Sequence, residues 1–573
     1  MAFPTKIHVV DSVFEKKISN YLAIGLFIIT VLIIAGPVSD PVNVPKLAAL
    51  GLISFGLLPF IVLKLSVREN LKAYRNPLII VLFFNLLATG STLLSKSPIS
   101  QNIYGILGRN NGLIAYISMS MILISIVFFR EKSSIEKILW GMFAAGLVNV
   151  FYGVIEHFFG DPIPWNNNYG ALLGTFGNPD FAGAFYGMFS GLLLAFALYS
   201  GFSIKSRLSA LILLPLTFLC VFWTDTTQGA LVTLISIAMV FLVYVHFRFN
   251  TRLLTFGYLS VVTISGLLIL LGILQKGPLA AFLYKRSVSL RGVYWDAAIQ
   301  TGRENFWFGV GLDSFGNWYR RARSLKAATW LPGPETITNV AHNYYLDIFA
   351  AGGILLLASY FSITCLGFYS LIKIARRLTF FDPIAASLAG LFIAFQAQAF
   401  ISIPQIGLAV WGWSLIGLLY SYSNVIDSSH STNSIKKIVQ NKKRKLDHPY
   451  GIYISLGSVL GLILAIPPYS ADAKWTEAIN TRDLIKLESA LKPTYLTPSN
   501  SDRLVNAVVI LEKSNLPEKA IEYARYGVVF NPENYDSWKM LYFSSLSTSD
   551  EKSKALRNMH RLDPLNKTLD NLK

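Results

Sequence analysis

The sequence predicts an all-α fold: a polytopic bundle of about 12–13 transmembrane helices, with a large extracytoplasmic loop and a C-terminal α-helical repeat domain. Composition is the first observation behind this prediction. Hydrophobic residues make up 53% of the 573 residues, charged residues only 14%, and the mean hydropathy is +0.49. A soluble chain carries about 25% charged residues, so most of this chain is expected to contact lipid. The two cysteines, Cys220 and Cys365, lie in apolar runs, which excludes a disulfide scaffold and a cysteine-built metal site.

The second observation is a series of apolar segments long enough to cross a bilayer, which takes about 20 residues in a helix. The first segment lacks a clear small-residue cleavage site after its apolar core, so we interpret it as an anchor and not as a signal peptide. Thirteen segments qualify: 19–36, 45–65, 77–95, 113–129, 138–159, 181–199, 208–224, 230–247, 253–274, 344–370, 383–402, 406–422 and 451–467.

Basic residues orient the predicted bundle. If the N-terminus is cytoplasmic, the inner segments carry 23 Lys and Arg residues, whereas the short outer loops carry three, Lys46, Lys96 and Arg109. Because such residues collect on the cytoplasmic side of a membrane, we expect the N-terminus inside and the C-terminus outside the cytoplasmic membrane. Topology therefore accounts for the net charge of +18 and for the basic run 436–445, and no nucleic-acid partner is expected.

This topology divides the chain into four parts. A membrane domain is expected over 1–425 and contains the long outer loop 275–343. A basic cytoplasmic linker over 426–450 and an additional transmembrane helix over 451–467 lead to an extracytoplasmic tail over 468–573.

The tail has a repeated pattern of its own. Asn531-Pro532 and Asp563-Pro564 each follow a helical pattern, and their prolines are 32 residues apart. This resembles tetratricopeptide repeats, which have a period of about 34 residues; an unrelated small helical domain is the alternative. In either case we expect the tail to dock a protein partner or an acceptor, because it carries no cluster of catalytic residues.

Several functional classes lack their motifs here. The sequence contains no Walker loop, Rossmann glycine fingerprint, His-Glu-x-x-His motif or paired CxxC, which argues against an ATP-driven pump and against a nucleotide or metal cofactor. The centres of most predicted spans are free of charge, which argues against an ion-coupled carrier. Polar residues collect instead in the predicted outer loops.

Two of the seven histidines, His157 and His342, are placed at the outer membrane surface by this topology. Histidine can act as a base near neutral pH. His157 lies in an apolar run, so a purely interfacial role is favoured for it. His342 ends a cation-rich loop and precedes Asn343, so it is favoured as a catalytic base, with an ordinary interfacial histidine as the alternative.

Arg291 and Trp295 are four residues apart and share one face of a predicted helix. We interpret them as an anion-binding arginine held by a tryptophan; a stacking pair that braces an amphipathic helix is the alternative. A guanidinium forms paired hydrogen bonds with phosphate, so Arg291, together with Arg109 and Arg286, would suit a diphosphate headgroup at the membrane surface.

In combination these motifs resemble the O-antigen ligase and polymerase superfamily of polytopic glycosyltransferases, over about 20–425. The resemblance is carried by Arg291-x-x-x-Trp295-x-x-Ala298, Gly309-x-Gly311-x-x-x-Phe315, Ala341-His342-Asn343-x-x-Leu346 before Gly352-Gly353, Gly177-Asn178-Pro179-Asp180 and Gly108-Arg109.

The resemblance implies a metal-independent, inverting transfer of a glycan at the outer face, without a cofactor. The donor would be a polyprenyl-diphosphate-linked glycan, and the acceptor a hydroxyl of a lipid, a glycan or a protein. The implied catalytic residues are His342 and Arg291, and the implied substrate-binding residues are Arg109, Arg286, Asn178, Asp180, Gln228, Trp295 and Asn343.

Gln228 departs from the family pattern. The turn after the seventh span usually carries an arginine before Gly-Ala, whereas Gln228 precedes Gly229-Ala230 here. Ligase and polymerase activities are not separated by these residues. The alternatives are a transporter or lipid flippase, and a non-catalytic membrane scaffold of a cell-surface polysaccharide pathway, which the missing charge at Gln228 would suit.

Overall fold

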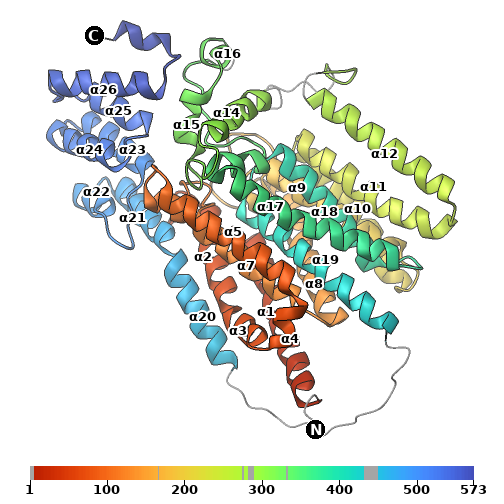
Figure 1. The fold of residues 1–573 in the computed structure, drawn as a ribbon. Helices are drawn as coiled ribbons and strands as arrows, with labels where there is room; N and C mark the ends of the chain where they lie inside the picture. Colours follow the sequence, from red (N-terminus) through yellow and green to blue (C-terminus); the bar gives the residue numbers. More distant parts are fainter. Residues whose placement is uncertain are drawn as a thin grey trace.

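The computed structural model describes residues 5–165, 167–273, 276–281, 290–330, 333–431 and 450–572. The described part is almost entirely helical and contains no β-strand (Figure 1), which confirms the all-α prediction. The helices of the first half are α1 (Thr5–Val31), α2 (Asn43–Gly56), α3 (Leu58–Leu65), α4 (Arg68–Ala73), α5 (Arg75–Leu94), α6 (Ile99–Tyr104), α7 (Leu113–Val127), α8 (Lys132–Phe159), α9 (Pro179–Leu198), α10 (Ile204–Trp223), α11 (Thr227–Phe249) and α12 (Arg252–Ile273).

The second half contains the long loop, the last membrane helices and the tail. Helices α14 (Arg291–Glu304), α15 (Phe315–Ala322) and α16 (Leu325–Thr329) lie in the long loop. They are followed by α17 (Tyr344–Arg377), α18 (Pro383–Ile401), α19 (Ile406–Ser431) and α20 (Tyr450–Ala465), and the tail contains α21 (Pro467–Thr481), α22 (Leu484–Leu491), α23 (Ser501–Lys513), α24 (Pro517–Phe530), α25 (Tyr535–Phe543) and α26 (Ser549–Leu562).

Every predicted span coincides with a helix, although not every one passes a length and hydropathy criterion. Ten helices among the described residues are long and apolar enough to cross a membrane, with α2 and α3 counted as one. The number becomes eleven if α20 and α21, which are bent by 50°, form a single span. The predicted span at 113–129 is α7, which has only 15 residues. The structure therefore supports a multi-pass membrane protein.

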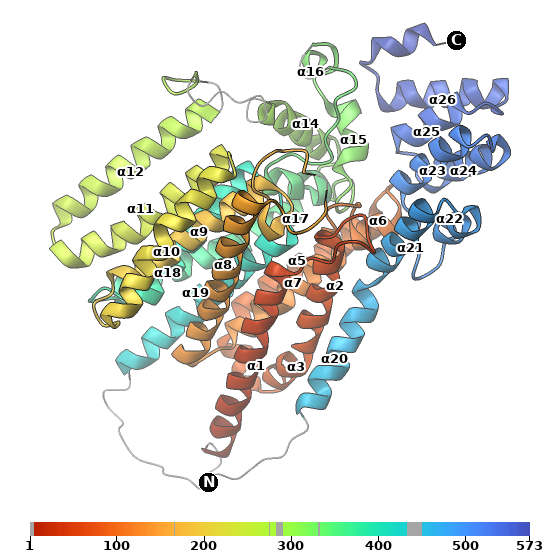
Figure 2. The same ribbon diagram turned by 180° about the vertical axis from the view of Figure 1, so that it is seen from behind.

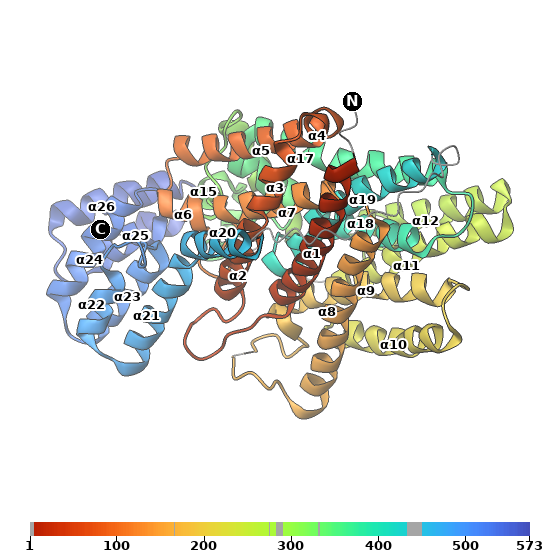
Figure 3. The same ribbon diagram turned by 90° about the horizontal axis from the view of Figure 1, so that it is seen from below.

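The long loop and the tail lie at the same end of the bundle. Figures 1 and 2 show α14, α15, α16 and the tail at one end, and the start of α1 at the other. Seen along the bundle in Figure 3, the tail lies on one side and α10, α11 and α12 lie on the opposite side. Which end faces the cytoplasm remains a prediction from the distribution of basic residues.

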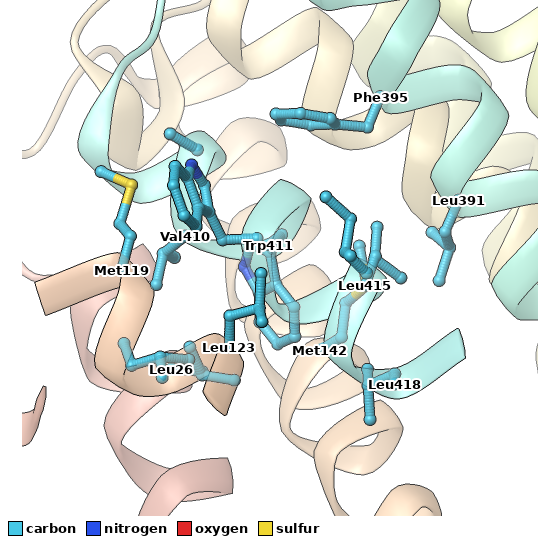
Figure 4. Packing of buried hydrophobic residues seen from close by; sticks show 14 of the residues in the cluster. Leu26, Met119, Leu123, Met142, Leu391, Phe395, Val410, Trp411, Leu415 and Leu418 are labelled. Atoms are coloured by element: carbon cyan, nitrogen blue, oxygen red, sulfur yellow. The ribbon is translucent and has the colours of Figure 1, made fainter. Parts of the chain in front are cut away.

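The membrane core is packed around Trp411 of α19. Its side chain is fully buried, and its Nε1 donates a hydrogen bond to Thr30 Oγ1 at 2.8 Å. Figure 4 shows the side chains around it, which come from α1, α7, α8 and α18. Lipid tails are as apolar as these side chains, so close packing and buried polar contacts, and not the hydrophobic effect, hold such helices together.

Helix α17 is broken at Gly353, which has φ 66° and ψ −166°. The chain before Gly311 lies against this break. The carbonyl oxygens of Ala350 and Ala351 accept hydrogen bonds from Val310 N at 3.0 Å and Gly311 N at 2.9 Å, and Ile354 N donates to Phe306 O at 2.7 Å. A helix interrupted in a membrane protein must find new partners for its backbone groups, and the chain from Phe306 to Gly311 provides them. The motifs Gly309-x-Gly311 and Gly352-Gly353 therefore lie on two segments that are hydrogen-bonded to each other. We call this contact, between the chain from Phe306 to Gly311 and the break at Gly353, the joint.

The tail is a stack of helix pairs, α21 with α22, α23 with α24 and α25 with α26, as Figure 2 shows. Its relation to tetratricopeptide repeats stays a prediction. It is joined to the long loop by ion pairs: Arg323 donates to both carboxylate oxygens of Asp563 at 2.7 and 2.8 Å, with both side chains fully buried. Arg321 pairs with Glu533 at 2.5 Å. The tail is therefore anchored next to α15, just after the segment that contacts the broken span.

Candidate functional site

Three predicted site residues from distant parts of the chain meet at one point. Arg291 is the first residue of α14 and is 6% exposed. Its Nη2 donates to Gln228 Oε1 at 3.4 Å and lies 3.8 Å from Asp180 Oδ2. Gln228 Nε2 donates to the carbonyl oxygen of Asp180 at 3.2 Å. Gln228 is thus a bridge that orients Arg291 towards the start of α9.

Asn178 fixes the start of α9. Its Oδ1 accepts a hydrogen bond from Asp180 N at 2.9 Å, and its Nδ2 donates to the hydroxyl of Tyr169 at 3.1 Å. Asparagine is among the best residues for capping a helix N-terminus in this way. The structure therefore gives Asn178 a positioning contact to the residue that faces Arg291.

Buried charges hold the loop that leads into α9. Lys46, predicted to lie in an outer loop, is fully buried in α2, and its Nζ donates to Thr30 O at 2.5 Å and Thr175 O at 2.9 Å. The carboxylate of Glu156 accepts from Leu173 N at 2.7 Å and from Gly174 N at 2.9 Å. The loop position of Asp180 thus depends on two ionisable residues that the sequence did not assign to the site.

His342 adopts a left-handed backbone conformation, with φ 52°. Its carbonyl oxygen accepts a hydrogen bond from Trp295 Nε1 at 3.4 Å, and its ring stacks on Tyr294 with centroids 5.5 Å apart. The next residue, Asn343, caps α17 by accepting from Tyr345 N at 3.0 Å and Leu346 N at 3.1 Å. Trp295 therefore holds the backbone of His342, while Arg291 on the same helix reaches Gln228 and Asp180.

The imidazole of His342 is held in its neutral form. Burial, the charge of Arg291 and then the charge of Arg109 lower its pKa to about 3. A positive charge close to a histidine disfavours the imidazolium. The three residues are therefore electrostatically coupled, and the ring of His342 is unprotonated at physiological pH.

Arg109 forms the second cationic point of the site. It lines a pocket together with Asp313 and Asp347. Burial lowers the pKa of Arg109, and the charges of Asp313 and Asp347 oppose this effect. Within the part of the chain that the structure describes, Arg109 Nη1 and Asp347 Oδ2 are buried without a hydrogen-bond partner. This pocket thus combines a guanidinium donor with a carboxylate acceptor.

Strained backbone conformations gather in the same region. Asn110, Asp313 and His342 have φ values of 59°, 51° and 52°. A non-glycine residue in this conformation costs roughly 1–3 kcal/mol and persists where the surroundings impose it, often at functional sites. In Asp313 the strain accompanies a hydrogen bond that its Oδ2 accepts from Ile106 N at 2.9 Å, which ties the long loop to the loop containing Arg109.

The structure leaves one predicted residue, Arg286, outside the described residues. It reveals Asp313, Asp347, Lys46 and Glu156 as further candidates. Asp313 lies inside the motif that begins at Gly309, and Asp347 is an acid at the start of an apolar helix. These positions could have identified Asp313 and Asp347 from the sequence. Lys46 and Glu156 could not be identified in this way, because their partners are too remote in sequence to be predicted.

Residues 208–361 match the O-antigen ligase family. Of the predicted site residues, the O-antigen ligase segment contains Gln228, Arg286, Arg291, Trp295, His342 and Asn343. It also contains both sides of the joint at Gly353, whereas Arg109, Asn178 and Asp180 lie before it.

The O-antigen ligase match supports a role in glycan transfer at a membrane. No curated protein was found to match the chain. Among the described residues, no three His, Cys, Asp or Glu side chains are grouped so that they could hold a metal ion.

Proposed function

We propose that this chain transfers a glycan from a polyprenyl-diphosphate donor to an acceptor hydroxyl at the outer face of the cytoplasmic membrane. The reaction is a metal-independent, inverting displacement of the ligase or polymerase type. The observation that carries the proposal is the pair of arginines, Arg291 and Arg109, whose charges both act on the neutral ring of His342. A cationic pair beside a neutral base suits a reaction that releases an anion and a proton.

The arginines would bind the diphosphate. Arg291 Nε and Arg109 Nη1 are buried donors without hydrogen-bond partners among the described residues, and guanidinium groups match phosphate oxygens in charge and geometry. As the bond to the sugar breaks, negative charge grows on the diphosphate, and preorganised donors stabilise it. Gln228 supports this role by accepting from Arg291, although it brings no charge itself.

The acidic residues would keep the arginines in place before the donor arrives. Asp180 pairs with Arg291 at 3.8 Å, and Asp313 lies near Arg109. Burial raises the pKa of Asp313, against the opposing charge of Arg109.

His342 would accept the proton. The acceptor oxygen attacks the anomeric carbon, the bond from that carbon to the diphosphate oxygen breaks, and its electron pair leaves with the diphosphate. The hydroxyl proton moves to the neutral imidazole of His342. One displacement inverts the anomeric carbon. Asp347, with its unpartnered Oδ2, is the second candidate for this proton.

A deletion strain tests the proposal. Loss of the chain should leave undischarged polyprenyl-linked glycan on the outer leaflet, and the wild-type chain should clear it. Positioned base catalysis contributes about a hundredfold to ten-thousandfold, so His342→Ala should lower turnover by that factor while insertion and donor binding stay near normal.

His157→Ala is the matched control, because the ring of His157 stacks on Trp223, with centroids 3.9 Å apart, and contacts Phe158. Normal turnover by His342→Ala would show that His342 is not the catalytic base. If turnover is lost in Asp347→Asn and not in His342→Ala, Asp347 is the base instead. Accumulation on the inner leaflet would favour a flippase, and no accumulation would favour a scaffold.

A further inference from the structure

A polar cleft separates the tail from the long loop. It is open to solvent, and its empty space of about 690 Å³ is about twice that of the pocket at Arg109, about 350 Å³. Its membrane-domain wall includes Asp313, Asn317 and Asn339, and its tail wall includes Asp502, Asn534 and Asp536.

The cleft lies next to the candidate site. Asp313 and Asn339 line both the cleft and the pocket that contains Arg109, so the two cavities share a wall. The membrane-domain wall and the tail wall of the cleft touch where Asn534 Nδ2 donates to Asn317 Oδ1 at 3.3 Å. A ligand in the cleft would therefore lie beside the pocket of Arg109, between the loop and the tail.

The charge of the cleft is negative. The guanidinium of Arg320 pairs with Asp563 at 3.3 Å and, more loosely, with the lining residue Asp536 at 3.9 Å. It also donates to Pro334 O at 3.0 Å and lies over the ring of Tyr535 at 4.2 Å. Three carboxylates, those of Asp313, Asp502 and Asp536, share the lining with it. Enclosure, followed by the charge of Asp536, raises the pKa of Asp502, so the carboxylates of α23 and α25 interact through the cleft.

We propose that this cleft binds an uncharged sugar chain, the glycan of the donor or of the acceptor, and that its carboxylates disfavour acidic glycans. This proposal rests on the proposed function and specifies that its glycan substrate is uncharged. Sugar hydroxyls both donate and accept hydrogen bonds, which suits a lining of amides and carboxylates. Uronic acids would add negative charge to a lining that already holds three aspartates against one arginine.

Binding to the full-length protein in detergent tests this without turnover. The probes are neutral oligosaccharides of glucose, galactose and N-acetylglucosamine, with an oligogalacturonate of equal length as the anionic probe. Wild type should bind at least one neutral probe more tightly than the anionic one. Asp502→Lys reverses one charge and should improve oligogalacturonate binding by about fivefold or more, because a unit charge near a partly enclosed group acts at this scale.

Asp550→Lys is the matched control. Both residues occupy the second position of a tail helix, α23 for Asp502 and α26 for Asp550, but Asp550 lies outside the cleft lining. Asp550→Lys should leave the affinities for the neutral probes and for oligogalacturonate unchanged. The proposal is overturned if no neutral probe binds, if wild type prefers the oligogalacturonate, if a peptide displaces the bound sugar at equal concentration, or if both lysine variants behave alike.

A turnover assay separates the two sources of the sugar chain. Asp502→Lys should raise KM for the donor if the cleft holds the donor glycan, and KM for the acceptor if it holds the acceptor. Arg291→Ala should lower the rate of transfer but keep sugar binding. If the protein has no transferase activity but binds sugar in a way that responds to Asp502→Lys, the cleft proposal holds and the proposed function is refuted. If the protein transfers glycan but shows no such binding, the proposed function holds and the cleft proposal is refuted.

Discussion

At the scale of single residues, Arg291 is held by one amide, that of Gln228, and one carboxylate, that of Asp180. Arg291→Ala should lower kcat/KM for a diphosphate-linked donor by roughly tenfold to a hundredfold, because a charge-assisted contact is worth about 1.5–3 kcal/mol. Arg291→Lys should rescue only part of this, since lysine keeps the charge but loses the planar fork. Arg303→Ala, at the exposed end of the same helix, is the control. Equal activity of Arg291→Ala and wild type would exclude Arg291 from the site.

The pKa of His342 gives a second prediction at this scale. In the free protein its pKa is about 3, so the base form persists above that pH, and kcat/KM, which reports the free enzyme, should be flat from about pH 8 to about pH 5. A bound diphosphate would offset the charges of Arg291 and Arg109 and so raise the pKa of His342. The value of kcat, which reports the complex, should therefore fall at a higher pH than kcat/KM as the solution is acidified.

Measuring kcat and kcat/KM against pH on reconstituted protein checks which of the two falls first on acidification. Arg109→Gln should bring the pH values at which they fall closer together, because one of the two positive charges that the diphosphate would offset is gone. If kcat/KM falls first, His342 is not the proton acceptor that the geometry suggests.

At the scale of elements, the joint between α17 and the segment from Phe306 to Gly311 is the most demanding feature. Gly353 has a conformation open essentially to glycine, and a Cβ there would meet the backbone of Phe306 and Trp307. Gly353→Ala should lower the free energy of unfolding by about 1–3 kcal/mol or more. Thermal unfolding in detergent measures this. Gly257→Ala in α12, where a Cβ meets open space, should be neutral, and equal effects of the two changes would mean that the joint is not strained.

The elements themselves were largely predictable, and the joint was not. Apolar runs of sufficient length give the membrane helices, because lipid forces each backbone group to bond within its own helix. The sequence showed Gly309-x-Gly311 and Gly352-Gly353 as separate motifs, but not that the segments around them exchange backbone hydrogen bonds in both directions. In the site, Arg291 and His342 were predictable from their motifs. The contacts of Lys46 with Thr30 and Thr175 were not, because they join three segments that only the folded bundle brings together.

At the scale of the whole molecule, the tail is fixed by the buried pair Arg323–Asp563. Arg323→Ala leaves the buried carboxylate of Asp563 with only its longer contact to Arg320, at 3.3 Å, so the cost should approach the about 3–5 kcal/mol that is typical of a broken buried ion pair. The tail of this variant should be cleaved faster by a protease added to intact proteoliposomes. The double variant Arg323→Met and Asp563→Leu should recover most of the resistance, because it removes both charges.

Arg525→Ala controls for charge loss in general. Arg525 pairs with Glu551 on the surface of the tail, where ion pairs contribute little, so cleavage should stay at the wild-type rate. Cleavage of Arg323→Ala at that same rate would mean that other contacts hold the tail.

The kind of bond that joins tail and loop also decides what their separation would expose. Between the two bodies lie carboxylates, guanidinium groups and amides, such as Glu533, Arg321 and Asn534. Water solvates all of these, so parting the surfaces would expose mainly polar groups, together with the ring of Tyr535 that packs on Arg320. The closed arrangement is held by the fit of opposite charges and not by the exclusion of water. We therefore expect that this interface between the tail and the long loop can separate and re-form in water while both parts stay folded.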